Sequence, residues 1–541
     1  MSSDTTSEEE AAEPGSGDHP DIGGPYARYV LFVLMLVYVF NFIDRNILSI
    51  LAEDIKADLG LTDAQLGFLY GTVFAVFYAI FGIPLGRLAD IWTRRKLIAT
   101  GLFFWSGMTA LSGTARSFLS LGAYRIGVGI GESSASPAAF SMLGDYFPPR
   151  VRATVLSIYS SGVYIGAGIG IFLGGWIVTG WDHFYPDGNA PFDLQGWQVA
   201  FFMVGLPGLA MAVWVWTLRE PIRGLSEGIK TAQSHPTPFR EFWKEFASVV
   251  PPMTLWSLHR AGAGTKGVGR NVLSALAMAA IAFGLIQIFG DPPQWIALGI
   301  GVYAFVSWVQ GLALRDHPTY AMIFGSKALV FSIVGFSTLA FSGYALGFWI
   351  PTFFQRIHGI STAETGTVLG LSAAIGGWIG ITSGGMISDR LKKATPTARI
   401  WVGVVTVLTN TPCVLGMLMT SNVYVAYACN FGNQMTASFW VGTVVAVANE
   451  LVLPRMRATS SAFYILTVTF IGLALGPYTV GKISDAFVAG GTDDGSALKY
   501  ALMISLLTFI VSIACFVVAG RHIEEDENTR IERARAAGEP G

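Results

Sequence analysis

Four charged residues stand inside long apolar segments of this sequence. Asp44 and Arg45 adjoin in the first such segment, and Arg125 and Glu132 lie seven positions apart in a later one. A spacing of seven places two side chains on one face of an α-helix, about two turns apart. A charge at membrane depth costs about 2.5–3.5 kcal/mol to insert, so such residues mark a functional site by default. Together they could exchange protons and bind an anion.

Other interpretations of these four residues stay open. They could form a permanently paired structural cluster, which would also lower the cost of burying them. Glu132 could be a second proton site or the partner of a gate. Arg45 could instead lie near the end of its helix, where a base fixes the orientation of the span.

The composition indicates a helical membrane protein. Hydrophobic residues make up 52% of the 541 positions and charged residues only 13%, about half the charged fraction of a soluble domain. The net charge of −2 and the lack of a basic stripe argue against a nucleic-acid partner. We find no phosphate-binding glycine loop and no histidine or cysteine spacing that fits zinc, so we expect neither an enzyme nor a cofactor or metal.

Apolar segments of about 20 residues predict fourteen spanning helices, arranged as six, two and six. The predicted domains are an acidic disordered tail, a first bundle, a linker carrying an extra transmembrane hairpin, a second bundle and a C-terminal tail, over residues 1–24, 25–220, 221–326, 327–521 and 522–541. The extra hairpin, with spans near 271–289 and 294–314, has no charge inside its spans, so we expect it to be peripheral and to face lipid.

Lys and Arg residues gather in alternate loops, and such loops face the cytoplasm. The basic loops contain Arg94–Lys96, Arg150 and Arg152, Arg390–Lys393, and Arg455 and Arg457. This pattern predicts a multi-pass protein of the plasma membrane, the inner membrane of a bacterium, with both termini in the cytoplasm.

The two six-helix blocks repeat each other. Gly60, Gly67, Gly71, Gly86 and Asp90 recur 299 positions later, ending at Asp389 (389 − 90 = 299). Pro149–Thr154 recurs as Pro454–Thr459 at an offset of 305 (454 − 149 = 305). A charged hexapeptide in the same loop of both blocks is hard to obtain by chance. Two parallel halves related about the membrane normal imply a central cavity that opens to one side at a time.

These motifs resemble those of the major facilitator superfamily. The segment Gly86–Lys96 is similar to that family's loop between helices two and three, with Thr93 in place of the commoner glycine, and Gly385–Leu391 is a degenerate copy. The resemblance implies a cytoplasmic gate in which aspartates at helix ends bind nearby bases and helix N-termini. The gate residues we expect are Asp90, Arg94, Arg95, Arg152, Asp389, Arg390 and Arg457.

Within that superfamily, Asn41–Asn46, Tyr124–Glu132 and Arg219–Pro221 resemble the spinster branch. The resemblance implies a proton-coupled secondary transporter, acting as a monomer, for an amphipathic lysophospholipid or sphingoid-phosphate-like lipid. It also implies that Asp44 meets Arg125 across the cavity, so that protonating Asp44 releases Arg125. An organic-anion or drug carrier of the same superfamily is the alternative.

The expected substrate cavity joins a charged wall in the first bundle to an aromatic and apolar wall in the second. Such walls would suit the head and the tail of an amphipathic ligand, although each residue alone is more often a packing or hydrogen-bonding residue between helices. The candidates are Asn41, Ser133, Tyr344, Trp349, Asn433, Gln434 and Trp440.

Overall fold

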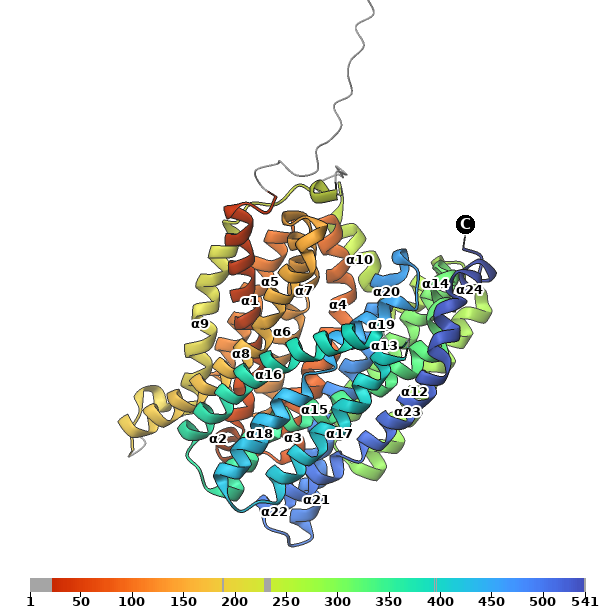
Figure 1. The fold of residues 1–541 in the computed structure, drawn as a ribbon. Helices are drawn as coiled ribbons and strands as arrows, with labels where there is room; N and C mark the ends of the chain where they lie inside the picture. Colours follow the sequence, from red (N-terminus) through yellow and green to blue (C-terminus); the bar gives the residue numbers. More distant parts are fainter. Residues whose placement is uncertain (1–21, 187–188, 228–234, 394, 396, 540–541) are drawn as a thin grey trace, which may run out of the picture.

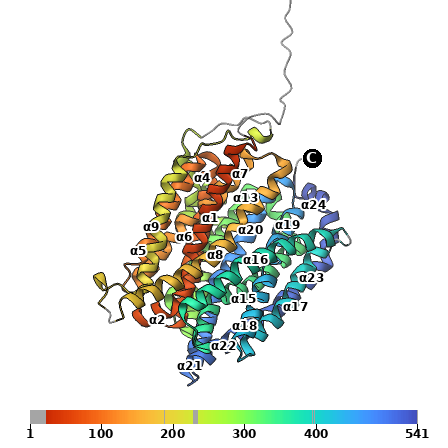
Figure 2. The ribbon, with the colours of Figure 1, turned by 60° about the vertical axis from the view of Figure 1, so that its left-hand side comes forward.

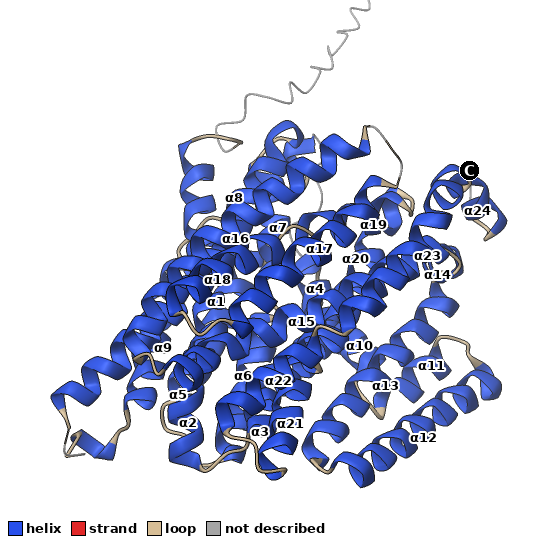
Figure 3. Ribbon diagram, turned by 60° about the horizontal axis from the view of Figure 1, so that its bottom comes forward, coloured by secondary structure: helices blue, strands red, loops and turns tan. Residues whose placement is uncertain are grey.

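The computed structural model describes residues 22–186, 189–227, 235–393, 395 and 397–539, and within these ranges all regular structure is helical (Figures 1 and 3). The predicted disordered tail, 1–24, lies outside the described residues except for its last three positions.

The first bundle, here the N half, runs from α1 to α9. Its elements are α1 (Pro25–Ile50), α2 (Ala52–Leu59), α3 (Asp63–Gly67), the π-helix η1 (Phe68–Thr72), α4 (Val73–Ile91), α5 (Arg94–Ser112), α6 (Phe118–Glu132), α7 (Ala135–Tyr146), α8 (Pro149–Phe184), the short η2 (Pro191–Asp193) and α9 (Gly196–Trp216).

The connecting region and the second bundle, here the C half, follow. The connection contains η3 (Leu225–Glu227), α10 (Pro238–Val249), α11 (Met253–Arg260), α12 (Gly264–Phe289), α13 (Pro292–Arg315) and α14 (His317–Phe324). The C half contains α15 (Lys327–His358), α16 (Thr362–Lys392), α17 (Ala398–Met419), α18 (Val423–Ala437), α19 (Val441–Glu450), η4 (Pro454–Met456), α20 (Arg457–Val468), the π-helix η5 (Thr469–Ala474), α21 (Gly476–Ala489), α22 (Asp494–Ser505) and α23 (Thr508–Asn528), and α24 (Arg530–Ala536) ends the described chain.

The predicted number of fourteen spans is not confirmed. Eleven helices of the described chain are long and apolar enough to cross a membrane. The predicted spans near 97–115, 121–143 and 422–448 fall on α5, α6 with α7, and α18 with α19, none of which is among the eleven. The last two are each broken near their middle, at Ser133–Ser134 and at Ser438–Trp440, so neither piece alone reaches spanning length.

The halves meet along two seams (Figures 1 and 2). In one seam α8 runs beside α16, and a side chain at Gly168 would lie 2.4 Å from the carbonyl of Gly370. In the other, α3 and η1 face α21 and η5, and Thr72 Oγ1 donates a hydrogen bond of 2.6 Å to the carbonyl of Ala474. Glycine at these positions lets the backbones approach closely.

Glycines recur at every fourth position of α8, from Gly162 to Gly174, and they have a packing role. Gly166 lies against the carbonyl of Val39 and Gly170 against that of Ile43, both on α1. The series therefore joins α8 to α1 within the N half, whereas Gly168 and Gly175 of the same helix approach α16 of the C half.

The extra hairpin α12–α13 lies beside the seam between α4 and η5. Its inner helix α13 packs on both: Gly301 contacts Val76 of α4 and Phe470 of η5, and Phe305 stacks on Phe463 of α20. The outer helix α12 exposes most of its apolar surface. The expectation of a peripheral hairpin thus describes α12, whereas α13 covers the line where the two halves meet.

Candidate functional site

A buried ion pair joins α1 to α6 inside the N half. Arg45 Nη2 donates to Glu132 Oε2 at 2.7 Å, and the Glu132 side chain is completely buried. Glu132 is the last residue of α6, next to the break at Ser133. Removing one partner of such a pair strongly destabilises the folded protein, because the other charge then stays buried without compensation.

The expected pairing of Asp44 with Arg125 differs in the structure. Arg125 Nη1 donates to the main-chain carbonyl of Asp44 at 3.3 Å, and both side chains are fully buried. Neither carboxylate oxygen of Asp44 has a hydrogen-bond partner in the described chain, and neither have Nε and Nη2 of Arg125. The ion pair is formed instead by Arg45 and Glu132, because the guanidinium of Arg45 reaches the end of α6.

Aromatic rings surround the two guanidinium groups. Arg45 lies 4.4 Å from the centre of the Phe74 ring and 4.8 Å from that of Phe42, and Arg125 lies 5.6 Å from the Phe74 ring. Tyr344, on α15 of the C half, is within electrostatic range of Arg45. The cluster therefore couples two cations to aromatic faces and lies near the contact between the halves.

The bases of the predicted cytoplasmic gate bind partners within their own half. Arg94 is fully buried and donates to Asp145 and, at 2.8 Å, to Glu220. In the C half Arg399 forms an ion pair with Glu450. These pairs obey the repeat at the offset of 305 (399 − 94 and 450 − 145), so each half carries its own copy of one interaction.

The other predicted gate residues are also held locally. Arg95 donates to the carbonyls of Trp216 and Leu218, Arg152 to the carbonyl of Gly144, and Arg457 to that of Asn449. Asp389 lies 3.6 Å from Arg399. Asp90 and Arg390 are exposed. We call this end of the molecule, with Arg94, Arg152, Arg399 and Arg457, the basic end; in the described chain its ion pairs do not join the N half to the C half.

At the opposite end, where α2, α3, α21 and α22 meet (Figure 1), ion pairs do join the halves. Arg356 of α15 donates to both carboxylate oxygens of Asp63 at 2.8 Å and to Glu53 at 2.7 Å. Asp485 of α21 accepts from the backbone N–H groups of Asp63 and Ala64. We call Glu53, Asp63 and Arg356 the latch.

Sequence reasoning missed the latch. Arg356 stands in the last turn of α15 and Asp63 at the start of α3, outside the basic loops that indicate a gate in the sequence. Nearby, on α2, the pKa of Asp54 is raised to about 7 by burial and by the negative charges of Asp182 and Glu53. This end thus holds a carboxyl group that can change charge near neutral pH.

The predicted cavity residues do not form one group. Asn433, Gln434 and Trp440 line a hollow of about 40 Å³ inside the C half, which has room for about one water molecule. Trp349 is buried, and its indole N–H donates to the carbonyl of Pro477 at 2.9 Å. Ser133 and Asn41 are buried in the N half near Glu132, and Tyr344 is within electrostatic range of Arg45.

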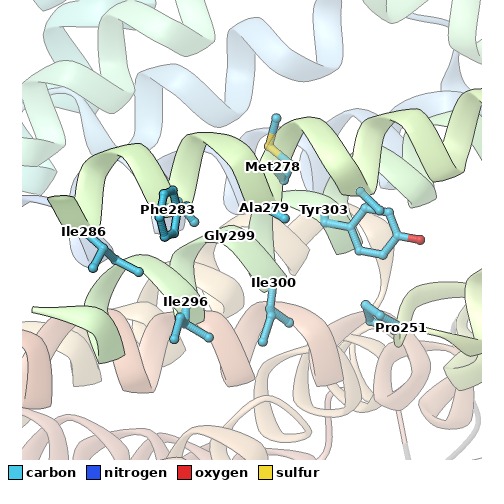
Figure 4. A pocket seen from close by; sticks show the side chains of 11 residues that line it. Pro251, Met278, Ala279, Phe283, Ile286, Ile296, Gly299, Ile300 and Tyr303 are labelled. Atoms are coloured by element: carbon cyan, nitrogen blue, oxygen red, sulfur yellow. The ribbon is translucent and has the colours of Figure 1, made fainter.

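A hollow of about 300 Å³ lies between α12, α13 and Pro251, away from the charged cluster (Figure 4). Its walls are apolar apart from Tyr303, whose hydroxyl bonds to Asn271 at 2.7 Å. It offers no charged side chain, and its one hydroxyl is already hydrogen-bonded, so we assign the chemistry to the charged cluster. The described residues contain no group of three or more His, Cys, Asp or Glu that could hold a metal ion.

Two helical halves with a repeated charge pattern and buried charges between helices define a membrane transporter. The chain belongs to the Major Facilitator Superfamily, whose profile matches residues 34–477. Within it the chain is a spinster-like transporter.

Three proteins illustrate the similarity. An MFS-type efflux pump of Mycolicibacterium smegmatis is 26% identical over 96% of this chain and 98% of its own length. Protein spinster homolog 1 of Xenopus tropicalis is 25% identical over 96% of this chain and 86% of its own. The crystal structure of a bacterial homolog of the human lysosomal transporter Spinster, inward-facing and unoccupied, is 25% identical, with a TM-score of 0.70 over 93% of this chain and 98% of its own.

Proposed function

We propose that this transporter carries an amphipathic lipid with an anionic head, of the lysophospholipid or sphingoid-phosphate type, and couples its movement to protons. The observation that carries the proposal is the buried ion pair of Arg45 and Glu132 beside the unpartnered carboxylate of Asp44. Two carboxylates and two guanidinium groups, Arg125 being the fourth member, share one buried site.

The charges suggest how protons and substrate are coupled. With every group ionised, the two positive and two negative charges cancel. Each proton bound by Asp44 or Glu132 leaves one net positive charge, which favours an anion at close range in a weakly polar site. Protonation of Glu132 also frees Arg45 to bind a phosphate or carboxylate head.

The surroundings suit the remainder of an amphipathic substrate. Phe42, Phe74 and Tyr78 lie around Arg45 on the N side, and Tyr344 of the C half is within electrostatic range of it. These rings offer apolar area beside the charged head site. We therefore place the head at α1 and α6 and the tail toward the C half, where Gln434 and Trp440 remain candidates.

The proposal includes an orientation and a cycle. We place the basic end in the cytoplasm, as the loop charges suggest, so the latch closes the outer side and the structure is inward-facing. In the opposite state the latch opens, and Asp90 and Asp389 meet bases of the other half at the basic end. The similarity to an inward-facing spinster homolog supports this assignment.

A second candidate is the efflux of organic anions or drugs. The name of the mycobacterial relative, an MFS-type efflux pump, favours it, and the same two guanidinium groups would bind an organic acid. The two candidates differ in whether the substrate needs an acyl chain.

Transport into proteoliposomes with an imposed pH gradient separates them. We expect uptake of labelled lysophosphatidylglycerol that collapses in Glu132→Gln and falls in Asp44→Asn, whereas Glu524→Gln, on the exposed face of α23, behaves as wild type. Uptake of a small dicarboxylate in place of the lysolipid would favour the second candidate. Lysolipid uptake that does not depend on the pH gradient would contradict proton coupling.

A further inference from the structure

The extra hairpin carries its basic residues at one end only. No Asp or Glu occurs between Glu245 and Asp291, whereas Arg260, Lys266 and Arg270 lie in that stretch. All three bases are exposed; Arg260 ends α11, and Lys266 and Arg270 lie in the first two turns of α12, at the basic end. The other end of α12 leads to Asp291, which is paired with Lys482. The bases near the start of α12 thus form a local positive surface.

A hollow of about 220 Å³ opens beside these bases. Leu258 of α11 and Val309 and Leu314 of α13 give it an apolar floor. Its polar side chains are Arg270, Gln310 and Tyr320. The hollow therefore combines an apolar surface with a cation at its edge.

The polar groups of the hollow differ in what they already bind. The Gln310 amide is used within the hairpin, where it accepts from Asn271 at 2.8 Å and donates to Ser274 at 3.1 Å. The side chains of Lys266 and Arg270 have no hydrogen bond or ion pair within the described chain.

The acids nearest to the hollow are already engaged. Glu245 lies 3.6 Å from Arg315, and Asp316 binds Arg455 at 2.8 Å. Hydrogen bonds from Arg455 and Thr319 outweigh the effect of burial and lower the pKa of Asp316. Both acids are thus paired with other bases, so Lys266 and Arg270 keep their charge available for an external anion.

Helix α12 itself must be covered by lipid. Leu273, Leu276 and Phe283 are 66%, 63% and 65% exposed, and the helix is long and apolar enough to span a membrane. Acyl chains that lie along this face bring their headgroups to the level of the first turns of α12, where the bases stand.

We propose that the hollow between α11, α12, α13 and α14 binds the headgroup of an anionic phospholipid from the surrounding leaflet. Lys266 and Arg270 bind its phosphate, the apolar floor holds the glycerol region, and the acyl chains lie along α12. The lipid would brace the hairpin, whose helix α13 covers the seam between the halves. This site is independent of the transported substrate and of the charged cluster.

Lipid binding to the purified full-length protein, followed by native mass spectrometry, tests the proposal. We expect phosphatidylglycerol to be retained in preference to phosphatidylcholine. The double variant Lys266→Gln/Arg270→Gln should lose about 30-fold in phosphatidylglycerol affinity, since each base near a lipid surface is worth roughly fivefold. Arg240→Gln, an exposed base on α10 outside the hollow, is the matched control and should bind as wild type.

A second variant separates the hollow from simple surface charge. Ala313→Phe fills the hollow and leaves every base in place, so this variant should also lose phosphatidylglycerol. If thermal unfolding shows that Ala313→Phe does not fold, Ala263→Leu takes its place. Wild-type retention in the filled variant, or in the double variant, would overturn the proposal. Displacement of the lipid by equimolar glycerol phosphate would also overturn it, because the site would then recognise a free phosphate ester.

Discussion

At one end of this transporter Arg356 of the C half holds Asp63 and Glu53 of the N half, whereas at the basic end Arg94 and Arg399 hold acids of their own halves. Both ends use buried or half-buried guanidinium–carboxylate pairs. They differ in what such a pair stabilises: the latch stabilises one arrangement of the halves, and the basic-end pairs stabilise each half by itself. The burial of an ion pair therefore does not reveal its role. What decides the role is whether the two residues belong to the same half or to different halves.

Breaking the latch should have the largest effect on how the two halves are arranged. Arg356→Ala removes the bidentate partner of the buried Asp63, which then keeps only Lys56 and Ser484, each at 2.8 Å. Losing one partner of a buried pair costs about 3–5 kcal/mol when nothing else compensates the charge, so we expect a cost of about 3 kcal/mol, which falls on the closed state of this end. We expect the distance between spin labels on α2 and α22 to widen and the basic end to narrow. Arg116→Ala, which removes an exposed base near the same end, is the control. An unchanged distance distribution in Arg356→Ala would show that these ion pairs do not hold the two halves together.

Breaking the repeated pair should destabilise the halves unequally. Arg94→Gln removes a completely buried guanidinium, so we expect a loss of about 3–5 kcal/mol in stability. Arg399→Gln should cost about 1 kcal/mol, because Glu450 is one-third exposed and water screens the pair. Thermal unfolding in detergent measures both variants. Equal losses would mean that burial does not decide the strength of these pairs.

A glycine in the seam near the latch sharpens the comparison at smaller cost. A Cβ at Gly67 would lie 2.4 Å from the carbonyl of Pro477, whereas one at Gly82 of α4 meets nothing within 4 Å. Gly67→Ala should weaken closure by about 1–3 kcal/mol through overpacking. Gly82→Ala is the control, because it gains the same helix propensity without the clash. If closure at the latch end were equal in the two variants, the result would argue against a tight seam. The label distance across the latch is the readout.

The pH response of the latch end should be the smallest effect. The pKa of Asp54 is raised to about 7 in the folded protein, above its usual value near 4, so its stabilising effect is complete below pH 4 and is lost as the pH rises through 7. We expect melting temperature to fall by a few degrees over this window, and Asp54→Asn to flatten the curve. A wild-type curve in that variant would assign the pH response to another group.

Much of the architecture could be predicted from the sequence. Apolar length gave most of the spans, and the Pro149–Thr154 repeat gave the two halves, because both depend on patterns within a single chain segment. The breaks in α6–α7 and α18–α19 could not be predicted, since Ser133 and Ser438 are not strong helix breakers. The repeat at the offset of 305 also contains the Arg94–Asp145 pair and its copy, Arg399–Glu450, and this correspondence can be seen by aligning the two halves of the sequence.

The candidate site was predicted in part. Burial cost identified Asp44, Arg45, Arg125 and Glu132, and the structure brings all four together. The ion pair in this structure joins Arg45 to Glu132, whereas Arg125 contacts the main-chain carbonyl of Asp44. Which side chains pair depends on helix rotation and on the reach of long side chains, which spacing does not encode. The latch was missed for a similar reason: Arg356 and Asp63 are 293 positions apart, and only the packing of the two halves joins them.

Proton movement during substrate uptake tests the central claim most directly. A pH-sensitive dye inside proteoliposomes reports the protons that accompany lysophosphatidylglycerol, with wild type compared against Glu132→Gln. The account predicts a substrate-dependent pH change in wild type and none in the variant, which should still bind substrate because its Arg45 is already free. Equal substrate-driven proton flux in the two proteins would contradict the assignment of the Arg45–Glu132 pair as the switch.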